Sequence, residues 1–237
     1  MYLPTTLEEV RARGWSGLDV ILVTGDGYID SPFIGAALIG KVLAREGLRV
    51  GIIAQPDVDG PGDITRLGRP ALFWGVTGGS VDSLVANTTA LGKRRRHDDF
   101  TPGGRNDRRP DRAVLVYTNL IRRFAPSPAP IVLGGIEASL RRLAHYDFWS
   151  DGLRRSVLLD AKADYLVYGM AEETVVALAR ELAAGRDPRG LPGLCYPAAA
   201  PPPEALQLPS WEELQEDPQA HLAMFRLAQS HRDPGSR

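Results

Sequence analysis

The feature that most constrains this chain is a repeated alternation of short apolar runs with loops rich in glycine and polar residues. The stretches between them carry apolar side chains at three- and four-residue spacing, which is typical of helices that bury one face. Short apolar runs bounded by turn residues are typical of buried parallel strands. The sequence therefore predicts an α/β, flavodoxin-like three-layer domain with a mostly parallel sheet. The five predicted strands span residues 19–24, 49–53, 71–76, 131–133 and 165–168.

The fourth of these runs ends in two consecutive glycines, Gly134 and Gly135. Glycines at a strand end allow a sharp turn and a close approach of the backbone. In open α/β sheets ligands bind at the carboxyl ends of the strands, where four polar loops of this chain are expected to meet. Tight turns after strands also need glycine without any binding role, but four such loops together favour a binding edge. The residues predicted to face a substrate are Asp26, Asp30, Gly78, Gly134, Gly135, Glu137 and His145.

Helix signals divide the chain into three parts. A capping box formed by Thr6 and Glu9 predicts an N-terminal helix within residues 1–16. The α/β domain is expected over residues 17–186, with Ser31 and Pro32 opening its first crossover helix. Residues 187–237 form a Pro- and Ala-rich linker and one terminal helix that starts at a second capping box and runs to about residue 229.

An irregular, charged insertion at residues 93–110 interrupts the crossover between the third and fourth strands. Residues 93–112 hold eight Lys or Arg and four Asp, a local net charge of +4, whereas the whole chain of 237 residues has a net charge of −1. Such an insertion is either a phosphate-binding surface or a solvated loop that faces another domain, and we favour the second. Long ordered loops of this kind are usually functional or mobile.

The residues point to no metal and no nucleotide cofactor within this chain. Asp30 stands where a Gly25-x-Gly27 dinucleotide fingerprint needs a third glycine, and a phosphate-loop lysine is absent. Cys195 is the single cysteine, which excludes a disulfide framework and a cysteine-only metal site in this chain. None of the four histidines has metal-ligand spacing to another ligand type. His145 is a general base or, as we favour, a packing histidine bonded to the nearby Asp147.

Compartment signals are sparse. The N-terminus has no secretory pattern, and no apolar run approaches the length of a membrane span. We therefore expect a cytoplasmic protein without a membrane partner.

Several motifs are long enough to carry a family resemblance. They lie at residues 3–5, 19–26, 51–57, 101–104, 109–112, 134–142, 145–147, 149–151 and 168–170. With these motifs the chain resembles, over residues 3–227, the N-terminal region of the YgiQ-type (UPF0313) radical SAM proteins. That resemblance implies a B12-binding-like α/β domain placed before a radical SAM barrel. In such proteins a Cys-x-x-x-Cys-x-x-Cys motif of the barrel holds a [4Fe–4S] cluster that binds S-adenosylmethionine.

The chain departs from this family pattern in its cysteines, and from the cobalamin motif of B12-binding domains at one position. Cys195 by itself cannot hold a cluster, so we expect a chain truncated before the barrel. The stretch Asp30 to Gly35 has the outline of the cobalamin motif Asp-x-His-x-x-Gly, but Pro32 occupies the position of the axial histidine. We therefore do not expect cobalamin binding through this position.

The leading functional hypothesis is an accessory N-terminal domain of a radical SAM [4Fe–4S] protein of unassigned reaction. Its partner would be a radical SAM barrel, in cis or in trans, and the chain by itself would not be catalytic. The alternative is a stand-alone nucleotide- or RNA-binding module that uses the glycine-rich loops and the basic insertion. A third hypothesis is a self-contained enzyme with Glu137 and His145 as acid and base.

Overall fold

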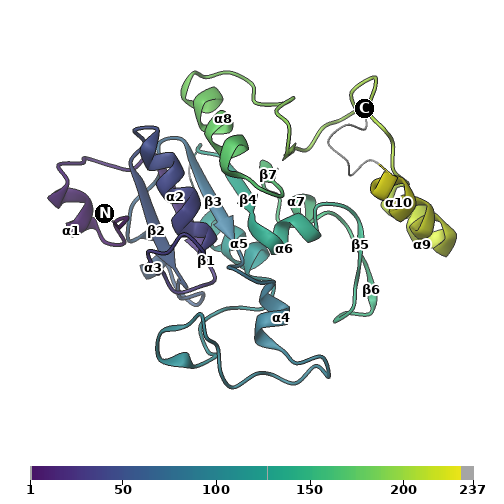
Figure 1. Cartoon of the computed structure of the whole chain (residues 1–237), viewed down its shortest axis with the longest axis horizontal. Coiled ribbons are helices and arrows are strands. Elements are labelled where there is room, and N and C mark those ends of the chain that lie inside the picture. Colours follow the sequence, from purple (N-terminus) through teal and green to yellow (C-terminus); the bar gives the residue numbers. More distant parts are fainter. Residues whose placement is uncertain (1, 127, 231–237) are drawn as a thin grey trace. The chain divides into compact units, whose positions relative to one another are not determined.

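The structure is a computed structural model that describes residues 2–126 and 128–230. The chain divides into two compact units, drawn with their elements labelled in Figure 1. The first unit comprises Met1–Arg142 and Val157–Pro197, and the second comprises Leu143–Ser156 and Ala198–Arg237.

The first unit is built on a six-stranded sheet with the order β2-β1-β3-β4-β7-β8. The first five strands pair in parallel, whereas β8 runs antiparallel to β7. The order of the five parallel strands is that of a flavodoxin-like domain, so the predicted fold class is confirmed. The sequence missed β8, which is two residues long and lies in the segment predicted as linker. The strands are β1 (Val20–Thr24), β2 (Val50–Ala54), β3 (Phe73–Thr77), β4 (Ile131–Gly134), β7 (Tyr165–Val167) and β8 (Leu194–Cys195).

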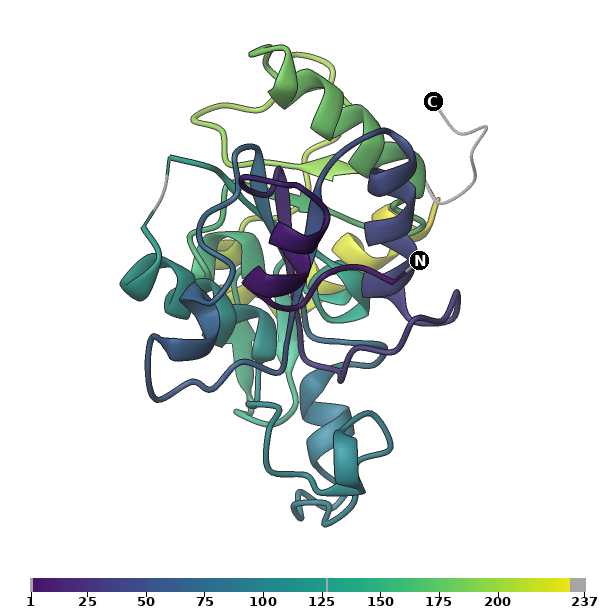
Figure 2. The ribbon, with the colours of Figure 1, turned by 90° about the vertical axis from the view of Figure 1, so that its left-hand side faces the viewer.

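Side chains alternate between two apolar cores, one on each face of this sheet. In β1, for example, Ile21 and Val23 enter one core while Val20 and Leu22 enter the other. The two helices α2 (Gly35–Arg45) and α8 (Glu172–Ala183) cover the second face and lie side by side (Figure 2). The first face is covered by α1 (Leu7–Ala12), α3 (Gly62–Thr65), α5 (Ala113–Phe124) and α7 (Val157–Asp160).

Two further helices follow strands of the sheet directly. After β3 the chain forms α4 (Ser83–Asn87), and after β4 it forms α6 (Gly135–Leu140). A short 3-10 turn, η1 (Pro102–Gly104), lies within the charged insertion. Because the connections after β1, β3, β4 and β7 all leave the same edge of a parallel sheet, this edge gathers the polar loops of the chain.

The first crossover helix begins later than predicted. Ser31 does not cap α2; its Oγ accepts a hydrogen bond from the Phe33 backbone N–H, and its carbonyl accepts one from Ile34 N–H. These bonds form a turn before the helix, so α2 starts at Gly35 with Ile34 as an N-cap that lacks a side-chain bond. The two predicted capping boxes, in contrast, are confirmed at Thr6 and at Ser210.

The second unit contains a β-hairpin and two helices. Strands β5 (His145–Asp147) and β6 (Gly152–Arg154) pair antiparallel. The prediction of one terminal helix was wrong, because α9 (Trp211–Glu216) and α10 (Pro218–Ser230) are separate. Asp217 adopts an extended conformation, as residues before proline do, and this ends the first helix. None of the described helices is both long and apolar enough to cross a membrane.

Candidate functional site

The carboxyl ends of the central strands lie in register. Thr24, Thr77 and Gly134 are cross-strand neighbours on β1, β3 and β4. The loops that follow therefore start side by side at one edge of the sheet. Six of the seven predicted site residues belong to the first unit, which contains this edge, whereas His145 belongs to the second unit.

Glycine is required at two positions of this edge. A Cβ on Gly25 would lie far inside contact distance of the Gly78 carbonyl oxygen, so the loops after β1 and β3 touch through their backbones. Gly135 has φ of +81° and opens α6, and a Cβ there would overlap the Thr77 hydroxyl. The glycine-rich loops thus allow three strand ends to approach one another.

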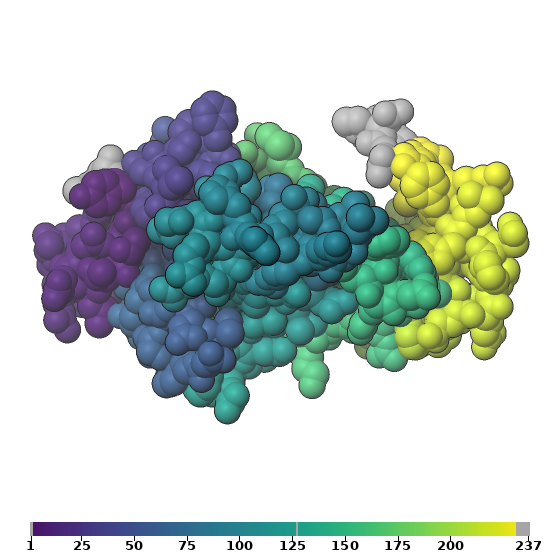
Figure 3. All heavy atoms as spheres, turned by 90° about the horizontal axis from the view of Figure 1, so that it is seen from below, coloured from purple at the N-terminus to yellow at the C-terminus, as the bar shows by residue number. Residues whose placement is uncertain are grey.

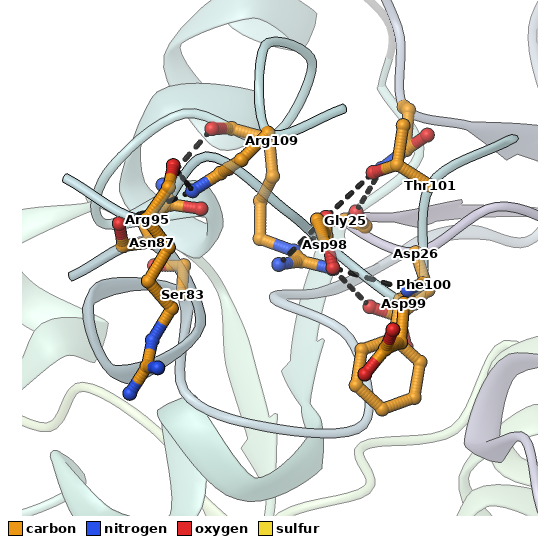
Figure 4. Close-up of polar contacts among 12 residues, drawn as sticks. Gly25, Asp26, Ser83, Asn87, Arg95, Asp98, Asp99, Phe100, Thr101 and Arg109 are labelled. Atoms are coloured by element: carbon orange, nitrogen blue, oxygen red, sulfur yellow. Dashed lines mark hydrogen bonds and ion pairs between the residues drawn. The ribbon is translucent and has the colours of Figure 1, made fainter. Parts of the chain in front are cut away.

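A buried ion cluster fixes the loop after β1 (Figure 4). Arg109 Nη2 lies 2.8 Å from Asp26 Oδ1, and Arg109 Nη1 lies 3.2 Å from Asp98 Oδ2. Arg109 Nε also donates to the Gly25 carbonyl oxygen over 3.0 Å. The exposed fractions of the Arg109, Asp26 and Asp98 side chains are 0, 1 and 2%. Removing such charges from water is costly unless they are paired. Arg109 pairs with both carboxylates, although its Nη1 makes no hydrogen bond among the described residues.

Hydrogen bonds from uncharged donors complete this cluster. Asp98 accepts bonds from the Thr101 hydroxyl at 2.5 Å and from the Phe100 backbone N–H at 3.0 Å. Gln55 Nε2 donates to Thr101 Oγ1 at 2.7 Å and to the Gly25 carbonyl oxygen at 2.9 Å. The second oxygen of Asp26 accepts the Ser80 backbone N–H at 2.6 Å. We call Asp26, Arg109, Asp98, Thr101 and Gln55 the Arg109 cluster.

The Arg109 cluster also anchors the charged insertion. Asp98, Thr101 and Arg109 all belong to this insertion, whereas Asp26 and Gln55 follow β1 and β2. In Figure 3 the teal-blue atoms of the insertion lie on the outer surface of the first unit. The insertion has little regular secondary structure, but buried polar contacts hold it against the loops after β1 and β2.

Several arginines of the insertion bind carboxylate or carbonyl oxygens of residues that are near them in the sequence. Arg94 pairs with Asp111 at 3.0 Å, and Arg105 pairs with Asp107 at the same distance. Arg95 Nε donates to the Thr88 carbonyl oxygen over 3.0 Å. The alternative hypothesis of a nucleic-acid partner gains no support from this arrangement.

Glu137 is buried, with 2% of its surface exposed. Its Oε2 accepts the Ser83 backbone N–H at 3.0 Å, and its Oε1 accepts the Val114 backbone N–H at 3.1 Å. Ser83 begins α4 and Val114 lies in the first turn of α5, so one carboxylate bonds the amino ends of two helices. Helix amino ends leave unpaired N–H groups and favour negative charge, which explains a buried glutamate at this position.

Tyr117 lies in the same polar interior. Burial raises the pKa of Tyr117, opposed by the nearby Arg109 cation and assisted by the Glu137 and Asp26 carboxylates. Its phenol is therefore neutral at physiological pH. The buried Tyr117 hydroxyl has no hydrogen-bond partner among the described residues.

The remaining predicted site residues have different surroundings. Asp30 is an exposed residue that pairs with Lys41 Nζ at 2.5 Å. Gly78 lies against the Glu137 carboxylate, and Gly134 lines a cavity described below. In the second unit, His145 Nδ1 lies 3.1 Å from the Leu143 carbonyl oxygen, and Asp147 accepts a bond from Ser150 Oγ at 2.5 Å.

Sequence reasoning missed the residue that organises the edge. Arg109 was one of several arginines in a basic segment, and nothing in its spacing singled it out as buried. Thr101 and Arg109 did lie in motifs 101–104 and 109–112, which carried the family resemblance. That resemblance was the available signal, but it gave no role to either side chain.

The described residues do not fit an iron–sulfur cluster or another metal centre. Within residues 2–126 and 128–230, no group of three His, Cys, Asp or Glu side chains could hold a metal ion. Cys195 is half-buried in β8, and burial raises the pKa of its thiol, opposed by Arg142. A protonated, isolated thiol is not a metal ligand.

A cavity of about 320 Å³ opens at the same edge, on the sheet face covered by α2 and α8. It is lined by β1, β3, β4 and β7, by the first turns of both helices, and by the loops that precede them. Asp26 belongs to this lining, so the Arg109 cluster borders the cavity. We call it the strand-face cavity.

Comparisons with known proteins agree with this architecture. The family model described as Radical SAM N-terminal matches residues 2–237. A UPF0313 protein from Thermotoga maritima is 54% identical over 99% of this chain, which covers 42% of that relative. A UPF0313 protein from Fusobacterium nucleatum is 51% identical over 98% of this chain and 41% of its own length. The chain therefore spans about two fifths of the curated relatives it matches.

A solved structure supports the fold. The radical S-adenosylmethionine methyltransferase TsrM from Kitasatospora setae, with tryptophan substrate and a SAM analogue bound, has a TM-score of 0.50. It is 21% identical, and the alignment covers 76% of this chain and 29% of that chain. At this identity the likeness shows the fold alone, and it confirms the expected B12-binding-like α/β domain. The family match, the long relatives and the fold together place this chain in the UPF0313 family, as its radical SAM N-terminal region.

Proposed function

We propose that this chain is an accessory domain that presents the carboxyl edge of its sheet to a radical SAM barrel. The family implies a [4Fe–4S] cluster and S-adenosylmethionine in the full-length protein, and we assign both to the remaining three fifths of the longer relatives. No step of the radical chemistry is assigned to residues of this chain. Its own contribution is to recognise a ligand and hold it at the edge of the sheet.

The observation that carries this proposal is the arrangement of the edge itself. Four strand ends, the strand-face cavity and a rigid buried anchor converge there. Apolar side chains are exposed beside the cavity, among them Ile136 with 43% of its surface exposed. A domain that acted by itself would leave this apolar edge in water, which favours a covering partner.

The proposal predicts protection of the edge in the longer protein. Hydrogen–deuterium exchange is compared between the full-length Thermotoga maritima relative and its fragment that matches this chain. Amides corresponding to residues 76–80, 134–140 and 168–172 should exchange several-fold more slowly in the full-length protein. Loops at the opposite edge, at residues 46–49 and 68–71, are the internal control and should not change. Equal exchange of the strand-end loops in both proteins would contradict the proposal.

Cobalamin is not proposed as a ligand held by an axial side chain of this chain. Pro32 is exposed in the turn before α2 and has no atom that can coordinate cobalt. We expect the absorption spectrum of hydroxocobalamin to stay unchanged when micromolar protein is added. A titration with an endpoint at micromolar protein would show that this expectation is wrong.

A further inference from the structure

The strand-face cavity lies where β4 ends in a glycine. Side chains alternate along a strand, so Gly134 shares the face of Val132, which is the face covered by α2 and α8. A Cβ on Gly134 would have only the Val167 carbonyl oxygen within 4 Å, at 3.7 Å. At Gly75 of β3, in contrast, the Leu22 side chain occupies the space that a Cβ would need. The open part of this face is therefore at the end of β4.

The helices above this face do not close the space. Deeper in the core, Leu43 of α2 and Leu178 of α8 are fully buried and fill the region between the helices. Near the carboxyl edge the first residues of α2 are Gly35 and Ala36, whose small side chains leave a gap. The cavity therefore lies beneath the amino ends of α2 and α8 and opens towards the loops that precede them.

The walls of the cavity are mainly aliphatic and aromatic. Its lining contains no Lys, Arg or His. It does contain two carboxylates, Asp26 and Glu172, of which Asp26 is already paired with Arg109. Apart from the amino ends of α2 and α8, the lining offers an anionic group such as a phosphate no positive partner, whereas an uncharged apolar group would displace water from apolar walls.

The mouth extends the apolar surface into solvent. Phe33, in the turn before α2, has 91% of its surface exposed, and Met170, in the loop before α8, has 86% exposed. Both residues line the cavity, on the sides of the two helices. Large exposed apolar side chains around a cavity are typical of binding sites, and methionine adapts to varied ligand shapes.

We propose that the strand-face cavity binds an uncharged, mainly apolar ligand group. This inference deepens the accessory function proposed above, because it names the class of ligand held at the edge. The cavity lies wholly within the first unit. Its test therefore uses this chain and does not require a barrel.

The test titrates the chain with Nile red, an uncharged solvatochromic dye, and follows its fluorescence. We expect saturable binding of one dye per chain with a shift to shorter wavelength, and no displacement by an excess of ATP. Absence of saturable binding, or displacement by ATP, would overturn the proposal.

Substitution of Gly134 locates the binding site. Gly134 has an extended backbone with φ of −161°, and the nearest atom to a Cβ there is the Val167 carbonyl oxygen at 3.7 Å. Leucine therefore fits this backbone and projects into the cavity. Gly134→Leu should weaken dye binding by about tenfold or more, and Gly134→Ala should have a smaller effect. The matched control is Gly60→Leu, because Gly60 also has open space around its Cβ but lies outside the cavity.

The outcomes separate this proposal from the accessory function. Equal dye binding by Gly134→Leu and the unchanged chain would overturn the cavity proposal, even if hydrogen exchange showed a protected edge. Should Gly134→Leu fail to fold, methyl NMR of the unchanged chain decides. Dye-induced shifts of Val132, Val167 and Ile39 support the cavity, and shifts confined to other methyl groups overturn it.

Discussion

Replacing Arg109 with alanine is expected to lower the free energy of unfolding by about 3–5 kcal/mol. The substitution leaves the carboxylates of Asp26 and Asp98 buried without their cation. It also removes the bond from Arg109 to the Gly25 carbonyl oxygen. Breaking one partner of a buried charge cluster costs more than the net contribution of the intact cluster, because the remaining charges stay desolvated.

Urea unfolding followed by circular dichroism measures this effect. The matched control is Arg94→Ala, which breaks an ion pair with Asp111 whose side chains are 47 and 45% exposed. That exposed pair should contribute about 1 kcal/mol or less. Equal destabilisation by the two substitutions would show that the Arg109 cluster does not anchor the insertion.

Hydrogen exchange distinguishes anchoring of the insertion from a general loss of stability. Amides of residues 96–106 should exchange faster in Arg109→Ala under conditions where the strands of the sheet stay protected. Asp98 and Thr101 lie in this stretch and hold the insertion against Gln55 and Gly25. Unchanged exchange of the insertion would contradict the anchoring role.

Glu137→Ala is expected to have the second largest effect, a loss of about 2–4 kcal/mol. The substitution removes the acceptor of two buried backbone N–H groups, those of Ser83 and Val114. Both amides lie at helix amino ends, where no intrahelical carbonyl can replace the carboxylate. Thermal and urea unfolding both report the change.

Glu9 provides the control for a glutamate at a helix amino end. Its carboxylate accepts bonds from the Thr5 and Thr6 backbone N–H groups, but at a position that is only partly buried. Water can replace it there, so Glu9→Ala should cost about 1 kcal/mol or less. If Glu137→Ala were as mild as Glu9→Ala, the buried carboxylate would not be a structural acceptor, and a role towards substrate would regain weight.

The buried carboxylates at the candidate edge use their oxygens for contacts within the protein. Both oxygens of Glu137 bond backbone amides, and both oxygens of Asp26 accept bonds from Arg109 and Ser80. These carboxylates hold loops and helices in place. The surface left for a ligand is the strand-face cavity with its apolar mouth, which is why we propose an uncharged apolar ligand there.

The fold could be predicted from local sequence patterns, because apolar runs indicate buried strands and glycine-rich or capping motifs indicate where the chain turns. The alternation within β1 follows from side chains that point to opposite faces, and apolar residues on both faces require helices on both sides. The capping boxes at Thr6 and Ser210 involve residues three apart, so they too are readable from sequence. A parallel sheet then places Gly78 and Gly134 at one edge without further information.

The first turn of α2 and the break between α9 and α10 show where local reading fails. Ser31 was compatible with both a cap and a turn, and the backbone adopted the turn. The apolar periodicity continues across Asp217 and Pro218, so it predicted one helix, but Pro218 begins a new helix. Each choice depends on small differences between local conformations, which a single sequence does not resolve.

The sequence by itself determined the fold, the family and the shared edge of the loops. Only the tertiary structure decided which side chains at this edge are buried and paired. Arg109 and Asp26 lie 83 residues apart, and Glu137 and Ser83 lie 54 apart, so no spacing rule connects them. The strand-face cavity likewise depends on the end of β4 at Gly134 lying beneath the first turns of α2 and α8. Ion pairs and cavities arise when distant segments approach, whereas periodicity reports only what each segment does locally.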